Sequence, residues 1–390
     1  MNFPDETTII IVDAPGLKGI RQRVQQLASR FAKIVSKNNG TVWYIDEPGN
    51  IVTVFISPEK PISNLWRWIS GPEKTSDEIR HFIPPAGLPF GYHNVGINQW
   101  NHFWYRLTLG SRFKKGNGPV ILIVANVLGY GWLGRLNETV SIYDCADEIS
   151  EFKQASLNRE AVKAQERKLI GAVDAVVTTS LNLHESKSPG AKKSMLIRNA
   201  AEIDHFKKAR QKFPRPEDIK NLKKPIVGFY GYLADWLDWE LIEYCAKNGA
   251  EFDWLYIGPT TRDLSSLEKL DNFHFIGKKP YDDLPQYLSH FSCAHIPFDR
   301  TPLTVNVNPV KIYEYLAASV PVVATPLPEL ELFSDICPVT DDPEKYLASI
   351  RQDIAENSEE KSNIRITRVE NETWDQRILD YANLITELLT

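Results

Sequence analysis

The sequence predicts an α/β protein built from two successive parallel-sheet domains. Its 390 residues are 43% hydrophobic and 24% charged, which is enough apolar material for two separate cores. Short β-rich runs alternate with amphipathic helical segments, as they do in a parallel sheet with crossover helices. The alternation stops at a polar, proline-containing stretch and then begins again, so we expect two similar halves.

The first half, residues 1–205, opens with a buried strand at 8–12, a glycine loop at 16–19 and a helix at 20–35. Further strands are expected where short apolar runs return, at 41–45, 120–124, 140–143 and 175–179. A polar, helix-forming segment that ends near Ile170 precedes the last of them. These elements predict one Rossmann-like domain.

Residues 206–224 are rich in Lys, Arg and Pro and poor in apolar side chains, which predicts an interdomain linker. The second half, 225–371, then repeats the pattern, with strands expected at 225–230, 252–257, 273–276, 293–297 and near Val322. Trp374–Leu388 is the last expected helix. Because ligands bind at the carboxyl ends of parallel strands, the glycines after these strands are expected to face a cleft shared by both domains.

Composition excludes several classes of protein. The net charge of -5 argues against a general nucleic-acid binder, so no nucleic-acid partner is expected. The four cysteines lie far apart, which indicates reduced thiols in a cytoplasmic protein. The chain has no basic segment typical of a signal peptide and no run of about 20 apolar residues, so we expect no membrane span.

The most informative segment runs from Asn308 to Thr325. Asn308 is expected to cap a helix, with Pro309 at its first position, and such a helix start offers free N–H groups to a phosphate. Lys311 and Glu314 lie three residues apart and therefore share one face of that helix. A carboxylate one turn into the helix can hold a vicinal diol, and a phosphate beside a diol is what a nucleotide presents.

This segment resembles the donor-binding motif of family 4 glycosyltransferases. It is most similar to bacterial members linked to surface-polysaccharide synthesis, which share the pattern Asn-Pro-x-Lys-x-x-Glu-Tyr-Leu-Ala followed by Pro-Val-Val-Ala-Thr. The chain departs from the broader family in four places: Asn306 stands where a first glutamate is usual, Ser319 where a glycine closes the helix, and Tyr232 and Trp236 where two cations are usual.

The resemblance implies the GT-B fold, with two facing Rossmann-like domains and a central cleft. The second domain would bind a nucleotide sugar and the first an acceptor, while residues 372–390 pack back on the first domain. The implied activity is transfer of a sugar to a glycan or lipid-linked acceptor, with retention and without a metal. The sequence leaves UDP-linked and GDP-linked donors open, and it also leaves open a sugar-nucleotide 2-epimerase and a non-catalytic GT-B subunit.

The resemblance also assigns roles to single residues of the second domain. Glu314 would hold the ribose hydroxyls, Lys311 and Arg300 the diphosphate, and Gly231 would give backbone access beside Tyr232. Lys278 and Tyr281 follow a strand end where the base would lie. For Arg300 a solvated loop arginine is an equal alternative, and the glycines after these strands can equally be plain turn residues.

Two regions of the first domain are further candidates. The loop that contains Gly19 and Arg21 opens the domain as GT-B enzymes often do, near donor phosphate and acceptor. Asp144 and Asp147 follow the strand at 140–143 and resemble a Tyr-Asp-x-x-Asp segment of the same bacterial subgroup. These carboxylates are expected to bind an acceptor hydroxyl or take its proton, and capping of the next helix is their alternative role.

Two further expectations concern metals and membranes. The eight histidines show no metal-binding spacing, so we expect no metal and no cofactor other than the donor itself. Aromatic and basic side chains accumulate in the first domain, and they fit either a packed core or a peripheral membrane contact at the inner face of the membrane. They are Trp66, Arg67, Trp68, Trp100, Trp104, Tyr105, Arg106, Arg112, Lys114 and Lys115.

Overall fold

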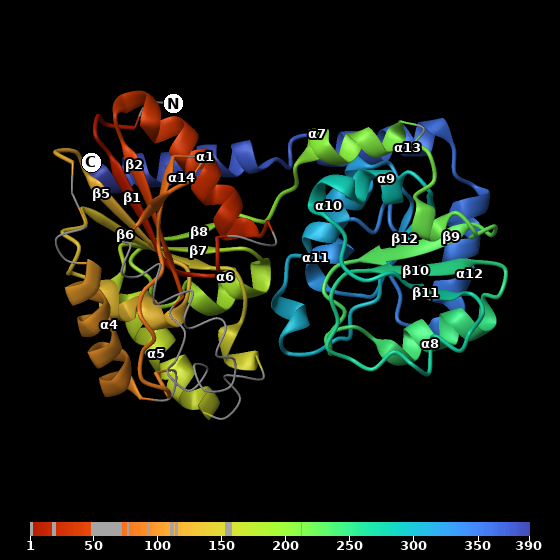
Figure 1. The fold of residues 1–390 in the computed structure, drawn as a ribbon, viewed down its shortest axis with the longest axis horizontal. Coiled ribbons are helices and arrows are strands. Elements are labelled where there is room, and N and C mark those ends of the chain that lie inside the picture. Colours follow the sequence, from red (N-terminus) through yellow and green to blue (C-terminus); the bar gives the residue numbers. More distant parts are fainter. Residues whose placement is uncertain are drawn as a thin grey trace. The chain divides into compact units, whose positions relative to one another are not determined.

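The computed structural model describes residues 3–17, 21–47, 72–75, 78–91, 94–109, 113, 116–152, 158–211 and 213–390. It divides into two compact units (Figure 1). The first unit comprises Met1–Arg198 and Trp374–Thr390, and the second comprises Asn199–Thr373. The predicted α/β class with two sheets of parallel strands is confirmed.

An 8-stranded sheet in the order β3-β4-β2-β1-β5-β6-β7-β8 forms the centre of the first unit, and only the β3–β4 pair is antiparallel among its described strands. The chain goes from β1 to β2 on one side and later to β5 on the other, so the topological switch point lies beside β1. The strands are β1 Thr8–Ala14, β2 Thr41–Asp46, β3 Glu73–Lys74, β4 Ile79–Phe82, β5 Val120–Val124, β6 Val140–Cys145, β7 Ala175–Thr178 and β8 Ser194–Leu196.

Helices cover both faces of this sheet. On one face α1 and α14 lie side by side, and on the other α4 and α5 pack over side chains such as Ile10 and Val12 (Figure 1). β1 is buried at every position, as a strand covered on both faces should be. The helices are α1 Arg23–Val35, α4 Val95–Leu109, α5 Arg159–Ala172, α6 Leu181–Lys187 and α14 Trp374–Leu389, with 3-10 turns η1 Ser36–Asn38, η3 Val127–Trp132 and η4 Ile149–Glu151.

The second unit has a 5-stranded parallel sheet in the order β11-β10-β9-β12-β13. Its switch point lies between β9 and β12. The strands are β9 Ile226–Tyr230, β10 Asp253–Ile257, β11 Phe273–Phe275, β12 Phe291–Ile296 and β13 Val322–Ala324. The helices are α7 Ile203–Phe206, α8 Trp239–Asn248, α9 Leu284–Leu288, α10 Val310–Ala317, α11 Pro328–Glu331, α12 Pro343–Ala355 and α13 Glu359–Val369, with 3-10 turns η6 Lys207–Arg210, η7 Glu217–Ile219, η8 Tyr281–Asp283 and η9 Thr304–Asn306.

The prediction of a linker at 206–224 is wrong. The chain passes from one unit to the other between Arg198 and Asn199, and the segment that follows belongs to the second unit. Its buried apolar side chains include Phe206, Ala209, Ile219 and Leu222, which belong to that unit's core. The segment looks like a linker because most of its described Lys and Arg residues are exposed and its apolar residues are few.

The carboxyl-terminal helix α14 belongs to the first unit and packs against α1. The rings of Phe31 and Tyr381 meet edge to face, with centroids 5.9 Å apart. Within the described part of the chain, no helix combines the length and apolarity that crossing a membrane requires.

Candidate functional site

Bare backbone lies at the carboxyl edge of the second sheet. Gly231 follows β9 and Gly258 follows β10, with φ angles of 153° and 146° that favour glycine. The N–H of Gly231 donates to the carbonyl of Ile257 (2.9 Å), and that of Gly258 donates to the carbonyl of Gly277 (2.9 Å). A Cβ atom on Gly258 would lie 1.7 Å from the Gly231 carbonyl oxygen. These loops therefore run in contact, next to the switch point where parallel sheets bind ligands.

Glu314 lies beside these loops on α10, and only 4% of its surface is exposed. Its Oε2 atom accepts hydrogen bonds from the Tyr230 hydroxyl (2.7 Å) and from Lys311 Nζ (2.9 Å). Among the described residues, no donor lies within hydrogen-bond distance of Oε1. Glu314 thus has one oxygen held by the protein and one that can accept hydrogen bonds from a ligand.

Tyr230 and Lys311 fix the orientation of this carboxylate. Burial, followed by the nearby negative charge of Glu314, raises the pKa of Tyr230 well above its usual range, so its hydroxyl remains a donor. Lys311 Nζ lies 4.7 Å from the centroid of the Tyr230 ring, a favourable position for a cation. Lys311 and Glu314 form an ion pair in which the glutamate is buried and the lysine is partly exposed.

Asn308 does not cap the helix, so that prediction is wrong. Pro309 occupies the cap position in an extended conformation, and no side chain caps α10. Asn308 is buried, and its Oδ1 accepts from the Asn199 N–H (3.0 Å) while its Nδ2 donates to the Tyr313 hydroxyl (3.0 Å) and to Glu329 Oε2 (2.8 Å). The side chain satisfies buried polar groups and so fixes the loop that precedes the helix.

The loop between β12 and α10 contains the other predicted phosphate contacts. Arg300 is exposed on this loop. Asn306 donates from Nδ2 to the Pro302 carbonyl (2.7 Å) and belongs to the turn η9. Tyr232 is exposed on the neighbouring glycine loop, with its ring centroid 5.5 Å from that of Trp236. These positions stay predictions.

The predicted base site is less open than the sequence suggests. Lys278 is exposed directly after Gly277. Tyr281 stacks on His205, with ring centroids 4.8 Å apart and planes 9° from parallel. One face of the Tyr281 ring is therefore already covered by His205, which directly precedes the segment expected to be a linker.

In the first unit, Asp144 has buried structural partners. Its carboxylate accepts from Arg23 Nε (3.0 and 3.1 Å to its two oxygens) and from the Tyr381 hydroxyl (2.6 Å). Arg23 also donates to the carbonyl of Arg198 (3.2 Å). This network joins β6 to α1 and α14, and it explains Asp144 better than proton transfer or helix capping does. Sequence spacing gave no sign of it, because the partners lie 121 and 237 residues away.

Asp147 has a different environment. It is half-buried, and among the described residues its carboxylate accepts no hydrogen bond. Burial raises the pKa of Asp147 to about 6, while Arg23 lowers it and Asp144 raises it. A carboxylate that titrates near neutrality is suited to general acid–base chemistry. The role of Asp147 at the acceptor stays a prediction.

The remaining predicted residues of the first unit have mixed outcomes. Arg21 is exposed just before α1, and Gly19 lies outside the described residues. Trp100 and Trp104 are exposed on α4 whereas Tyr105 is buried, so the packed-core interpretation is wrong for the two tryptophans. The other aromatic and basic residues of that group, apart from Arg106, also lie outside the described residues.

Two buried polar clusters of the first unit were not predicted from the sequence. Asp13, near the end of β1, accepts from Trp132 Nε1 (3.0 Å) and lies 3.3 Å from His102 Nε2, while its Oδ1 is buried and has no hydrogen-bond partner among the described residues. Its φ of 49° is rare for a non-glycine residue. Lys187 pairs with Glu148 (2.7 Å) and Glu166 (2.6 Å). An Asp directly after the first buried strand was a signal that could have found Asp13.

The part of the chain that the structure describes contains no group of three or more His, Cys, Asp or Glu side chains that could hold a metal ion. Operation without a metal stays a prediction.

Comparison with known proteins identifies the fold. No protein-family model matches the chain. Over 206 residues it is 28% identical to the "Putative teichuronic acid biosynthesis glycosyltransferase TuaH" of Bacillus subtilis (strain 168), a match that covers 48% of this chain and 50% of that protein. The chain therefore spans about half the length of this curated relative.

Solved structures match over almost the whole chain. Sucrose-phosphate synthase from Thermosynechococcus elongatus superposes with a TM-score of 0.69 at 14% identity, covering 98% of this chain and 99% of the other. The fold is GT-B. Alr3699/HepE from Anabaena in complex with UDP and glucose gives a TM-score of 0.63 at 14% identity, covering 97% and 99%. An E. coli trehalose-6-phosphate protein bound with UDP-2-fluoro glucose gives 0.68 at 10% identity, covering 98% and 99%. At these identities the likeness establishes the GT-B fold alone.

Proposed function

We propose that this protein is a glycosyltransferase of the family 4 type that transfers a sugar from a nucleotide-sugar donor to a glycan or lipid-linked acceptor of a bacterial surface polysaccharide. The observation that carries the proposal is the Glu314 site: a buried carboxylate with one open oxygen, next to a lysine and to Gly231 and Gly258 in the loops at the switch point. The names of the matched proteins, a glycosyltransferase and a complex with UDP and glucose among them, support it.

The second unit binds the donor in this proposal. Glu314 Oε1 accepts hydrogen bonds from the ribose hydroxyls, while Tyr230 and Lys311 hold Oε2. Lys311, Arg300 and the start of α10 face the diphosphate. As the bond between the anomeric carbon and the diphosphate oxygen breaks, the electron pair leaves with the diphosphate, and these groups stabilise the negative charge that develops. Cationic side chains would thus stabilise the charge of the leaving diphosphate, as a metal ion does in other enzymes.

The first unit binds the acceptor. The acceptor hydroxyl forms the new bond to the anomeric carbon and gives up its proton, which Asp147 receives directly or through a water molecule. Retention of anomeric configuration is proposed from the family 4 resemblance. A cytoplasmic location follows from the proposed use of nucleotide sugars.

Calorimetric titration with UDP and GDP tests the donor site. Hydrogen bonds to a charged group contribute roughly 1.5–3 kcal/mol, so Glu314→Ala should lower nucleotide affinity by about ten- to a hundredfold. Glu331→Ala, which removes an exposed carboxylate of the same unit, is the matched control and should bind like the parent. A folded Glu314→Ala variant with parental affinity would remove the ribose assignment.

Incubation with the donor alone separates the alternatives. A 2-epimerase would convert the nucleotide sugar without an acceptor, whereas a transferase needs one. A non-catalytic subunit would bind the nucleotide but convert the nucleotide sugar neither alone nor with an acceptor.

A further inference from the structure

Helix α4 has an apolar outward face. Its sequence contains Arg106 as its single Lys, Arg, Asp or Glu residue. One side of the helix is buried through residues that include His102 and Tyr105. On the opposite side Trp100 is 59% exposed, Phe103 46%, Trp104 44% and Leu107 58%. A helix on a water-covered surface usually presents polar residues outward, so an aromatic face of this kind indicates a partner.

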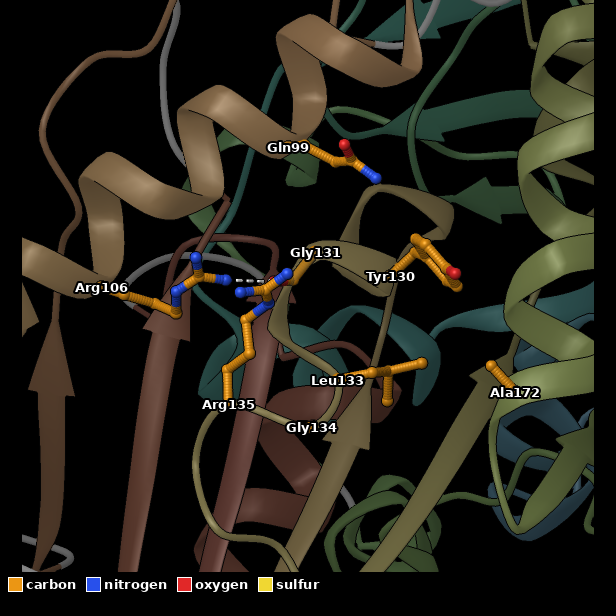
Figure 2. A pocket seen from close by; sticks show the side chains of 8 residues that line it. All are labelled: Gln99, Arg106, Tyr130, Gly131, Leu133, Gly134, Arg135 and Ala172. Carbon is orange, nitrogen blue, oxygen red and sulfur yellow. Dashed lines mark hydrogen bonds between the residues drawn. The ribbon is translucent and has the colours of Figure 1, made fainter.

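A cationic pocket adjoins this face. Gln99 and Arg106, two turns apart on α4, line a cavity of about 280 Å³ together with Arg135 from the loop before β6 (Figure 2). Tyr130, Gly131, Leu133, Gly134 and Ala172 also line it, so its described lining includes two arginines and no carboxylate. Arg106 Nη1 donates to the Gly131 carbonyl (2.8 Å), which holds that guanidinium in place.

The pocket is suited to an anion. Partial burial lowers the pKa of Arg106, and the neighbouring positive charge of Arg135 lowers it further. A bound anion would offset the repulsion between these two cations. The nearest carboxylate along the loop, Glu138, is already used, since it accepts from the backbone N–H groups of Gly134 and Leu136. Arginine pairs are a common means of binding phosphate.

We propose that α4 docks on an anionic membrane surface, with the face formed by Trp100, Phe103, Trp104 and Leu107 in the lipid interface and a lipid phosphate in the Arg106–Arg135 pocket. Helical geometry places Gln99 and Arg106 between the buried side of α4 and its aromatic face, so one bilayer surface can fill both. Indole rings favour the interfacial zone, and arginines favour anionic headgroups.

The pocket distinguishes lipid from other occupants. Free phosphate would leave the aromatic face uncovered. A second copy of this chain docked through α4 would bring its own arginines to the same face and add positive charge to positive charge. An anionic bilayer supplies both the apolar layer and the negative charge, and the inference does not depend on nucleotide binding.

Vesicle flotation tests the proposal. The full-length protein should float with vesicles of phosphatidylcholine and phosphatidylglycerol, and much less with phosphatidylcholine alone. Replacing both tryptophans (Trp100→Ala with Trp104→Ala) should lower the vesicle-bound ratio by more than about tenfold, because both indoles lose their interfacial burial. Arg135→Gln should lower it by about fivefold, and Arg135→Glu further. Higher salt should weaken binding of the parent.

Control variants change exposed apolar or basic residues elsewhere on the protein. Leu332→Ala with Ile364→Ala removes exposed apolar side chains of the second unit, and Arg167→Gln removes an exposed arginine of α5. Both should float like the parent, and all variants should keep the parental thermal midpoint and nucleotide affinity. Equal flotation of the tryptophan variant and the parent would overturn the proposal. Equal binding of the parent to neutral and anionic vesicles would also overturn it. So would release of the protein from vesicles by inorganic phosphate when the tryptophan variant binds like the parent. Concentration-dependent dimerisation through α4 without vesicle binding would overturn it as well.

Discussion

The Lys311–Glu314 ion pair differs from an ordinary surface pair because its carboxylate is buried. An exposed pair three residues apart on a helix contributes a few tenths of a kcal/mol. Glu314 is instead covered by Tyr230 and Lys311, which bind the same oxygen. Leaving a buried charge without partners costs several kcal/mol, so those two residues belong to the site as much as Glu314 does. The spacing of Lys311 and Glu314 was visible in the sequence, whereas the contribution of Tyr230 was not.

Asp147 should make both stability and activity depend on pH. Its folded pKa of about 6 lies above the unfolded value of 3.8, so the folded state holds the proton more tightly. The resulting stability is complete below the unfolded pKa and is lost as pH rises through about 6. Thermal midpoints measured across this range should therefore fall more for the parent than for Asp147→Asn, which does not titrate.

The transfer rate should change in the opposite direction. If Asp147 takes the acceptor proton, only its charged form is active, and the rate should rise as pH passes about 6. Asp147→Asn should remove that rise and lower the rate while nucleotide affinity stays unchanged. An unchanged rate in a folded Asp147→Asn variant would place the acceptor base elsewhere, with Asp13 the next candidate.

At the scale of elements, α10 shows both what a local pattern predicts and what it misses. The helix and the following strand at 322–324 were predicted from Pro309, Lys311 and the apolar run. The position of Asn308 could not be predicted, because its partners Glu329 and Asn199 come from distant segments. Helix α4 was not predicted at all, since it lacks the outward polar residues by which a surface helix is recognised.

The end of α10 offers a test of backbone strain. Ser319 has a φ of 62°, and its N–H donates to Leu316 while that of Val320 donates to Tyr315, which is a glycine-type helix ending. The left-handed conformation costs a non-glycine residue about 1–2 kcal/mol, and glycine loses about 0.5–1 kcal/mol of chain entropy. Ser319→Gly should therefore stabilise the second unit by about 0.5–1 kcal/mol in urea unfolding.

Ser319→Ala serves as the control for that measurement. It removes the hydroxyl but keeps the conformational cost, and it leaves the carbonyl that accepts from Arg365 Nε (3.0 Å). Its stability should stay near that of the parent. A Ser319→Gly variant that is less stable than both would mean that the entropy cost of glycine exceeds the relief of the left-handed conformation.

For the whole molecule, the sequence predicted the two parallel sheets but misplaced the point where the first unit ends. Periodicity reveals strands because each one buries its own apolar run. A unit boundary depends instead on which core receives a few anchors such as Phe206 and Ile219, and spacing does not show that. The first unit is also discontinuous, since α14 completes it from the far end of the chain.

The junction of α14 with the first unit gives a prediction for the stability of the whole chain. Asp144→Asn leaves the buried charge of Arg23 without its carboxylate and should lower the free energy of unfolding by about 3–5 kcal/mol. Tyr381→Phe removes one hydrogen bond to Asp144 and should cost about 1–3 kcal/mol. The double variant should lose less than the sum, because both changes disturb one network.

Urea unfolding measures these losses, and calorimetry should find nucleotide affinity unchanged in the folded variants, because the network lies within the first unit. If Asp144→Asn proved as stable as the parent and yet transferred sugar far more slowly, Asp144 would belong to the chemistry and its pairing with Arg23 would not be what holds α14 in place.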